Sequence, residues 1–318
     1  MKLVQAPALP SLARVGEGEG RTLTVGVVQM HWQSDPDAHT AALADGVRRA
    51  AEAGAQVVFL PELTLSRYPA DTRPEGRAAD LAEPIEDGPT RTLAEKLARE
   101  HGVFVHASLY EQAGPSDGSD DDSDDGLGFN TAILVAPDGR LAGRTRKLHI
   151  PVTEGYFEDH FFRPGPADEP YPVHVADLPG SPRLGLPTCW DEWFPEVARA
   201  YSLADAEVLA YPTAIGSEPD HPDFDTQPLW QQIIVGNGIA NGLFMCVPNR
   251  WGDEGRVSFY GSSFVSDPYG RILAQAPREG DAVLVATLDL DQRRDWLELF
   301  PFLATRRPDT YGSLVEKP

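Results

Sequence analysis

The feature that most constrains this chain is a regular alternation between two kinds of segment. Short β-branched runs, bounded by Gly, Pro, Asp or Asn, alternate with longer Ala-rich amphipathic stretches. Such alternation is typical of an α/β fold. We expect strands at 24–30, 57–61, 103–110, 131–136, 183–187, 207–211, 243–248, 262–266 and 282–288, and helices at 37–53, 89–101, 194–204 and 228–241. Nine short strands predict two sheets.

Two turn sequences indicate that the sheets are mixed. Pro-Asp-Gly at 137–139 and Asp-Pro-Tyr-Gly at 267–270 each join two apolar runs and are typical of hairpins. No linker divides the chain, so we expect a single domain over 22–318, preceded by a flexible N-terminal tail over 1–21. An acidic run around 114–127 holds six Asp residues and is expected to be a surface insertion.

Charge and composition exclude several classes of protein. Lys and Arg number 27 against 49 Asp and Glu, and the net charge of −22 repels nucleic acid and anionic membranes. Apolar runs are shorter than the roughly 18 residues of a membrane span. Two cysteines are too few for a disulfide framework, which favours a reducing compartment and a cytoplasmic location. The His and Cys spacing matches no zinc motif, so we expect neither a metal nor another cofactor.

Three polar residues follow apolar runs and are candidates for chemistry. Glu62 ends Val-Val-Phe-Leu-Pro-Glu, and ligands of α/β sheets bind beyond the carboxyl ends of strands. Lys147 ends a basic stretch that leads into Leu-His-Ile-Pro. Cys189 follows a strand that breaks at Pro187, and such a strand-to-helix turn exposes a nucleophile near free N–H groups. Read singly, Glu62 is equally a solvated loop carboxylate, Lys147 an edge-strand lysine and Cys189 a buried structural thiol. Cys246, within Leu-Phe-Met-Cys-Val, matches the buried structural thiol better.

Taken together, these motifs resemble the nitrilase superfamily of carbon–nitrogen hydrolases. The resemblance rests on Phe-Leu-Pro-Glu62, Arg-Lys147-Leu-His-Ile-Pro and Cys189-Trp-Asp-x-Trp-Phe-Pro-Glu, in this order, and covers about residues 22–311. Within the superfamily, the chain looks most like the N-carbamoylputrescine amidases. The resemblance implies a four-layer αββα sandwich with a mixed two-sheet core, usually assembled into homodimers or larger homo-oligomers.

The resemblance also implies a mechanism. Glu62 is expected to be the general base and Cys189 the nucleophile, while Lys147 and the backbone N–H of Trp190 stabilise the oxyanion. An S-carbamoyl enzyme then reacts with water, and N-carbamoylputrescine yields putrescine, carbon dioxide and ammonia, a step of polyamine biosynthesis. A second active-site glutamate of the family corresponds to Glu158 by its spacing to Pro164-Gly165, with Glu154 as the competitor.

The remaining substrate contacts are expected on neighbouring loops. Glu218 is a candidate partner for a cationic amine tail, and Tyr68 and Trp190 are expected to line the channel for its methylene chain. Asp191 and Thr213 complete the expected substrate-binding set. Tyr68 and Glu218 also have plain structural interpretations, in packing, capping or ion pairing.

Several alternatives remain open from the sequence. The family motif usually has Gln where this chain has Glu192, which bears on amine preference. Another N-carbamoyl amine, an N-carbamoyl amino acid or an aliphatic amide is the nearest alternative substrate. An anionic substrate would need an arginine clamp, for which Arg250 is the candidate. A catalytically idle nitrilase-like binding module is the alternative from a different class, and three intact triad residues argue against it.

Overall fold

Two sheets form the centre of the chain in the computed structural model, which describes residues 1–114 and 125–316. The first sheet has the order β1 (Lys2–Ala6), β17 (Ala282–Asp289), β2 (Thr22–Gln29), β3 (Val57–Phe59), β4 (Phe104–Glu111), β5 (Phe129–Val135) and β6 (Leu141–Arg146). The second has the order β16 (Ile272–Gln275), β15 (Phe264–Ser266), β12 (Phe244–Val247), β11 (Val208–Ala210), β10 (Arg183–Gly185) and β9 (Val173–Val175). Both sheets mix parallel and antiparallel pairs, as the turn sequences predicted.

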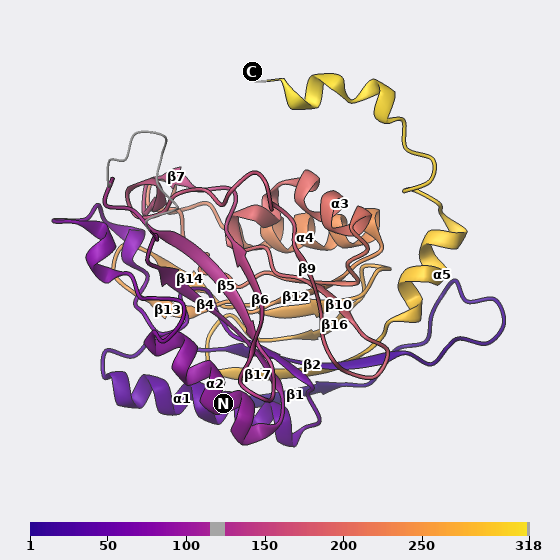
Figure 1. Ribbon diagram of the computed structural model, residues 1–318, viewed down its shortest axis with the longest axis horizontal. Coiled ribbons are helices and arrows are strands. Elements are labelled where there is room, and N and C mark those ends of the chain that lie inside the picture. The colour runs from indigo at the N-terminus through magenta and orange to yellow at the C-terminus, as the bar shows by residue number, and fades with distance from the viewer. Residues whose placement is uncertain (115–124, 317–318) are drawn as a thin grey trace.

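Helices cover the outer face of each sheet. Helices α1 (Pro36–Glu52) and α2 (Pro89–His101) pack on the first sheet, and α3 (Pro195–Leu203) and α4 (Gln227–Asn241) pack on the second (Figure 1). Alternating side chains of β2 explain the layering, because Val25 and Val27 enter the core between the sheets whereas Val28 faces the helices. The expected four-layer αββα sandwich with a mixed two-sheet core is therefore confirmed.

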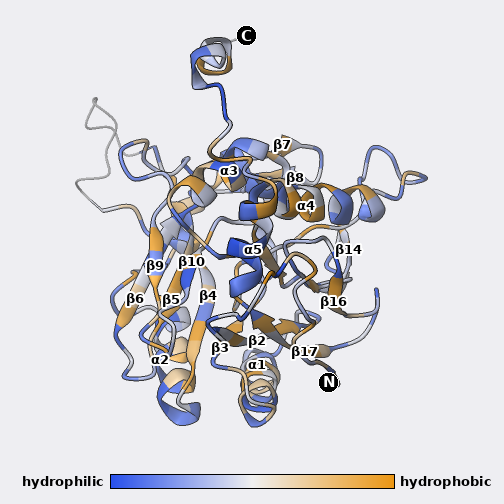
Figure 2. Cartoon of the chain, turned by 90° about the vertical axis from the view of Figure 1, so that its right-hand side faces the viewer, coloured by the Kyte–Doolittle hydropathy of each residue, from blue (hydrophilic) through white to orange (hydrophobic). Residues whose placement is uncertain are grey.

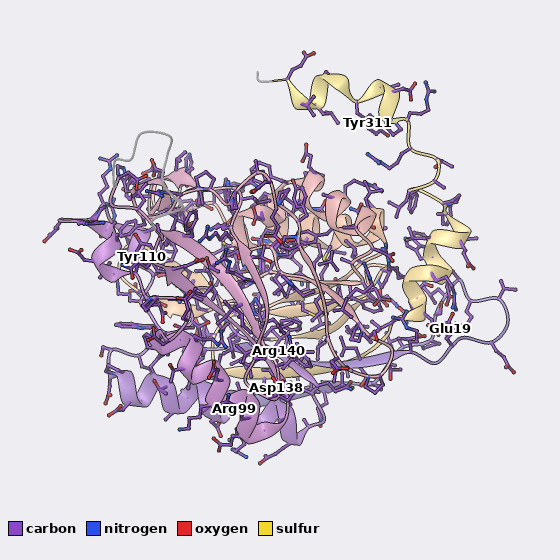
Figure 3. The ribbon with its side chains drawn as sticks, viewed as in Figure 1. Glu19, Arg99, Tyr110, Asp138, Arg140 and Tyr311 are labelled. Carbon is purple, nitrogen blue, oxygen red and sulfur yellow. The ribbon has the colours of Figure 1, made fainter. Side chains whose placement is uncertain are left out.

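Both predicted hairpins are present. β5 and β6 pair antiparallel across 136–140, where Arg99 Nε of α2 donates to the backbone oxygen of Asp138 at 2.9 Å (Figure 3). β15 and β16 pair antiparallel across 267–271. The acidic run falls mostly at 115–124, outside the described residues.

The flexible tail expected over 1–21 is wrong for residues 2–6, which form β1 and pair in parallel with β17. Val4 and Ala6 pack against the core between the sheets, so this short strand buries apolar surface along the edge of β17. The following segment is held by polar contacts: Arg14 pairs with Asp289 at 2.7 Å, and Gly20 N donates to Asp291 Oδ2 at 2.9 Å.

A few shorter elements complete the described chain. Two small ribbons, β7 (Val152–Thr153) with β8 (Tyr156–Phe157) and β13 (Trp251–Asp253) with β14 (Ser258–Tyr260), lie between the larger elements, and α5 (Asp291–Leu299) follows β17. Single 3₁₀ turns occupy Pro69–Asp71, Ala78–Leu81, Glu158–His160, Cys189–Trp193, Pro308–Thr310 and Gly312–Val315. Within the described ranges, no helix is both long and apolar enough to cross a membrane.

Candidate active site

Four segments bring ionisable side chains to one edge of the two sheets. Glu62 follows β3, Lys147 follows β6 and Glu158 begins the 3₁₀ turn after β8. Cys189 begins the 3₁₀ turn after β10, in the second sheet. These are the carboxyl ends of β3, β6 and β10, where the open ends of strands leave room for a ligand.

Lys147 lies between two carboxylates and is fully buried. Its Nζ is 3.0 Å from Glu62 Oε1 and 2.7 Å from Glu158 Oε2, and all three side chains are almost inaccessible to water. The charges of both carboxylates raise the pKa of Lys147 against the opposing effect of burial, so the side chain remains an ammonium. An ammonium has three N–H donors, and two of them are directed at these carboxylates.

Glu62 has one occupied and one available carboxylate oxygen. Oε1 accepts hydrogen bonds from Lys147 Nζ and from Asn130 Nδ2, the latter at 2.7 Å. Oε2 is buried and has no hydrogen-bond partner among the described residues. The backbone is also held, because Arg250 Nη2 donates to the carbonyl oxygens of Glu62 and Leu63 at 2.7 and 3.1 Å. The carboxylate is thus oriented with one oxygen able to accept a proton.

Cys189 has a strained backbone at the start of a largely buried turn. Its φ of +42° lies in the left-handed region, which a residue with a Cβ rarely adopts, and its N–H donates to Pro212 O at 3.0 Å. The side chain is almost completely buried. Burial first, and the charge of Glu62 second, raise the pKa of the thiol, whereas Lys147 lowers it. The resting thiol is therefore neutral, and reaction needs a base to remove its proton.

Glu158, and not Glu154, is the second glutamate at this cluster. Its Oε1 accepts a hydrogen bond from Tyr68 Oη at 2.8 Å, and its Oε2 accepts from Lys147. Burial, opposed by Lys147 and reinforced by Glu62, raises the pKa of Glu158 to about 7. Glu154 instead pairs with Arg256 at the surface.

Asp191 links the segment that follows Lys147 to the 3₁₀ turn Cys189–Trp193, which we call the nucleophile turn. Its carboxylate accepts from His149 N at 2.9 Å, His149 Nδ1 at 2.8 Å and Thr188 N at 3.1 Å. The ring of His149 stacks on Phe194 at a centroid distance of 3.7 Å. Because protein donors occupy both oxygens, Asp191 positions the loops around Cys189, which differs from its expected contact with substrate.

Of the other expected substrate residues, Tyr68 and Thr213 make contacts inside the protein, whereas Trp190 and Glu218 are partly exposed. Tyr68 is fully buried and its hydroxyl serves Glu158, and the Thr213 hydroxyl donates to Tyr211 O at 2.8 Å, so both hydroxyls are used inside the protein. Trp190 is half-buried beside Cys189, with its ring 6.2 Å from that of Trp193. The fourth, Glu218, lines a pocket.

The Glu218 pocket has a volume of about 470 Å³ and is rich in acidic side chains. Its lining consists of Thr153, Glu154, Glu218, Asp220, His221, Phe224 and Thr226. Tyr156 connects it electrostatically to the buried cluster, because the charges of Glu218, Cys189 and Glu158 all add to the effect of burial in raising the pKa of the Tyr156 hydroxyl. The Tyr156 hydroxyl therefore lies within electrostatic reach of both the pocket and the buried cluster.

Arg250 is not available as a clamp for an anionic substrate. Its Nη1 pairs with Glu254 Oε2 at 2.7 Å, and its Nη2 is held by backbone oxygens that include those of Glu62 and Leu63. The guanidinium is buried and supports the loop after β3.

Sequence reasoning missed Asn130 and Glu254, although one of them carried a signal. Asn130 stands inside β5, a strand in which every residue is buried, and a lone amide in such a run needs a partner. Glu254 has no comparable pattern, because its partners Arg250 and Tyr68 become its neighbours only in the fold. In residues 1–114 and 125–316, no three His, Cys, Asp or Glu side chains are grouped as metal ligands.

Similar proteins of known family show which family the chain belongs to. The family model for carbon–nitrogen hydrolases matches residues 24–298. The chain is 35% identical to a citrullinase of Francisella tularensis over 93% of this chain and 99% of the relative, and 34% identical to an N-carbamoylputrescine amidase of Arabidopsis thaliana over 94% and 97%. A carbon–nitrogen hydrolase structure from Helicobacter pylori G27 superposes with a TM-score of 0.82 at 30% identity, covering 93% of this chain and 99% of that one. The chain therefore belongs to the carbon–nitrogen hydrolase family of the nitrilase superfamily, and is a hydrolase of carbon–nitrogen bonds other than peptide bonds.

Proposed function

We propose that the chain removes the carbamoyl group from a small amine with a cationic tail, of which N-carbamoylputrescine is the type. Cys189 is the nucleophile, Glu62 the general base, Lys147 the oxyanion donor and Glu158 the residue that holds Lys147. The observation that carries the chemistry is the free oxygen of Glu62. Its Oε1 is fixed by Lys147 and Asn130, whereas Oε2 is buried without a partner among the described residues and close enough for its charge to act on Cys189.

The first half-reaction forms a covalent enzyme. Glu62 takes the proton of the Cys189 thiol, and the sulfur attacks the carbamoyl carbon. The third N–H of Lys147 and the backbone N–H of Trp190 stabilise the oxyanion, since the N–H groups of Cys189 and Asp191 donate to Pro212 O and Thr188 O. The bond from the carbon to the amine nitrogen breaks, and Glu62 returns the proton to the departing amine.

The second half-reaction releases the carbamoyl group. Glu62 takes a proton from water, whose oxygen attacks the thioester-like carbon. The carbon–sulfur bond breaks, and Glu62 returns the proton to the departing sulfur. The released carbamic acid decomposes to carbon dioxide and ammonia. The balance is one carbamoyl amine and one water giving one amine, one carbon dioxide and one ammonia.

The acidic pocket supports a cationic tail. Glu154, Glu218 and Asp220 share this pocket, and a half-buried carboxylate makes charge-assisted hydrogen bonds with an ammonium. Nearby cations are already in use, because Arg256 pairs with Glu154 and Arg250 with Glu254. A carboxylate on the tail would meet like charge here, which disfavours N-carbamoyl amino acids.

A second candidate substrate is citrulline, which the name of the Francisella relative raises. Citrulline has the same carbamoyl group and an ammonium at a similar distance, and differs by its α-carboxylate. The two substrates therefore test whether the acidic pocket tolerates a negative charge. The acids that line the pocket favour N-carbamoylputrescine.

The test is product release by the purified protein from four compounds: N-carbamoylputrescine, citrulline, N-carbamoyl-β-alanine and a plain aliphatic amide. We expect amine and ammonia from N-carbamoylputrescine, with the highest kcat/KM of the four and complete loss in Cys189→Ala. A higher kcat/KM for citrulline than for N-carbamoylputrescine would overturn the proposal that the substrate lacks a carboxylate, while the Cys189 mechanism would stand. No Cys189-dependent turnover of any compound would overturn the proposal as a whole.

We also propose that the chain forms a homodimer or a larger homo-oligomer. Large apolar side chains are exposed after α5, at Phe300, Leu314 and Val315, and the C-terminal segment stands away from the layered body (Figure 2). Apolar surface of this kind is typical of a protein interface. Sedimentation of the full chain should give a mass above one protomer, and truncation after residue 303 should lower it. A monomeric full chain would contradict the proposal.

A further inference from the structure

Glu192 is a buried carboxyl group in the nucleophile turn that the reaction scheme leaves without a role. It lies three residues after Cys189 and is inaccessible to water. Two hydrogen bonds link it to α4: Trp230 Nε1 donates to its Oε1 at 2.7 Å, and Asn237 Nδ2 donates to its backbone oxygen at 3.0 Å. Oε2 is buried and has no hydrogen-bond partner among the described residues.

These contacts do not suffice for a buried carboxylate anion. A buried charge needs an ion pair or several donors, and the donor to the Glu192 carboxyl is one neutral indole. The adjacent Asp191 illustrates the difference, because the backbone and ring N–H groups of His149 and the N–H of Thr188 all donate to it.

The surrounding charges also disfavour an anion at Glu192. The groups that act on it are Asp191 and Cys189 of the same turn, Glu62 after β3, Lys147 after β6, Tyr211 after β11, Trp230 of α4 and Tyr260 of β14. Lys147, the cation of this group, is already shared by Glu62 and Glu158. An ionised Glu192 would add a negative charge that nothing nearby balances, and that charge would make the thiolate of Cys189 harder to form.

We propose that Glu192 works as a neutral carboxylic acid that positions the nucleophile turn. The proton resides on Oε2, Oε1 accepts from Trp230, and the uncharged link holds α4 against residues 189–193. Burial, reinforced by Glu62 and Asp191, raises the pKa of Glu192 well above its usual range, in agreement with this state. A glutamine, which the family motif usually has here, would provide the same acceptor without charge.

The first experiment measures the protonation state of the Glu192 carboxyl group directly. Infrared spectra of wild type and Glu192→Gln at neutral pH should differ by the loss of one protonated-carboxyl band. Glu207→Gln is the matched control, because Glu207 is also buried but pairs with Arg21 at 2.8 Å, so its loss should remove a carboxylate signal instead. An unchanged protonated-carboxyl region in Glu192→Gln would overturn the proposal.

The second experiment measures the pH dependence of Cys189 reactivity and needs no substrate. The pH midpoint for alkylation of Cys189 by iodoacetamide should be the same in Glu192→Gln as in wild type, because a neutral amide replaces a neutral acid. An ionised Glu192 predicts instead that removing its charge lowers the midpoint by about one pH unit, roughly tenfold in rate below it. That shift would overturn the proposal.

The third experiment separates positioning from general stability. Glu192→Ala deletes the acceptor of Trp230 and should slow Cys189 alkylation at its pH plateau by roughly tenfold, on the scale of a lost buried hydrogen bond. Glu192→Gln should restore the rate. Failure of Gln to restore it would overturn the positioning role, and if the Ala variant does not fold, the infrared and midpoint measurements still decide.

Discussion

Lys147 Nζ and Glu158 Oε2 lie 2.7 Å apart in a site where both side chains are almost inaccessible to water. The pair is not balanced by itself, because Glu62 shares the same ammonium. Two carboxylates and one ammonium leave an excess negative charge when all three groups are ionised. Burial favours the protonated form of Glu158 and raises its pKa to about 7, so this group changes its charge near neutral pH.

Removing Lys147 should strongly reduce turnover and lower stability. Lys147→Met deletes an oxyanion donor, and kcat should fall by about 10²–10³. It also leaves two buried carboxylates without their cation, which should cost about 3–5 kcal/mol of unfolding free energy. Steady-state kinetics and urea denaturation check both effects. Lys96→Met, at an exposed position of α2, is the control and should change neither.

Glu158 should give the activity an ionisation near neutral pH. Its pKa is raised to about 7, mainly by burial, and the ionised form is the one that pairs with Lys147. We expect kcat/KM to rise as pH increases through about 7. In Glu158→Gln, kcat/KM should be lower, and its rise with pH through this range should be missing. A step of the same position and size in the variant would assign the ionisation to another group.

Glu218 should determine affinity for the cationic tail and not the chemical step. Loss of one charge-assisted hydrogen bond, about 1.5–3 kcal/mol, predicts at least roughly tenfold higher KM for N-carbamoylputrescine in Glu218→Gln. A neutral aliphatic amide should be turned over as before, because it has no ammonium to place. Asp223→Asn, an exposed acid nearby in sequence, is the control. An equal loss on both substrates would remove Glu218 from tail recognition.

The layers of the fold could be predicted from sequence because buried elements have strong apolar periodicity. The nine expected strands and four expected helices all exist, with ends displaced by a few residues. The nine ranges omit β1, β6, β9 and β16, which are the outermost strands of the two sheets, and the strands of the two small ribbons. The hairpin turns implied β6 and β16 without giving their bounds. The four helix ranges omit α5, which is strongly hydrophilic (Figure 2). Such elements bury little apolar surface, so their sequences carry little periodicity.

The residues of the site were also only partly predictable from the sequence. Glu62, Lys147, Cys189 and Glu158 stand in motifs whose order identifies them, and the fold brings their charges together. Contacts between distant segments had no such signal. Trp230 and Glu192 are far apart in sequence and meet only when α4 packs on the nucleophile turn. Tyr68 is oriented by Glu158 across an even larger separation in sequence.

His106 is a buried histidine that lies on β4 between the two sheets. It is fully buried against the ring of Phe59, and neither ring nitrogen has a hydrogen-bond partner among the described residues. Burial, and to a smaller extent the charge of His174, lowers its pKa from 6.5 to about 3. The unfolded chain therefore takes up a proton at a pH where the folded chain does not.

The sign of the effect follows from this difference. Above pH 6.5 both states are neutral at His106, and below it each pH unit should cost about 1.4 kcal/mol of unfolding free energy, until about pH 3. Urea denaturation of wild type and His106→Gln between pH 7 and pH 4.5 measures the slope, which should be shallower in the variant whatever its stability at pH 7. His160→Gln, at an exposed position, is the matched control and should keep the wild-type slope. Parallel curves for wild type and His106→Gln would show that other groups carry the loss of stability in acid.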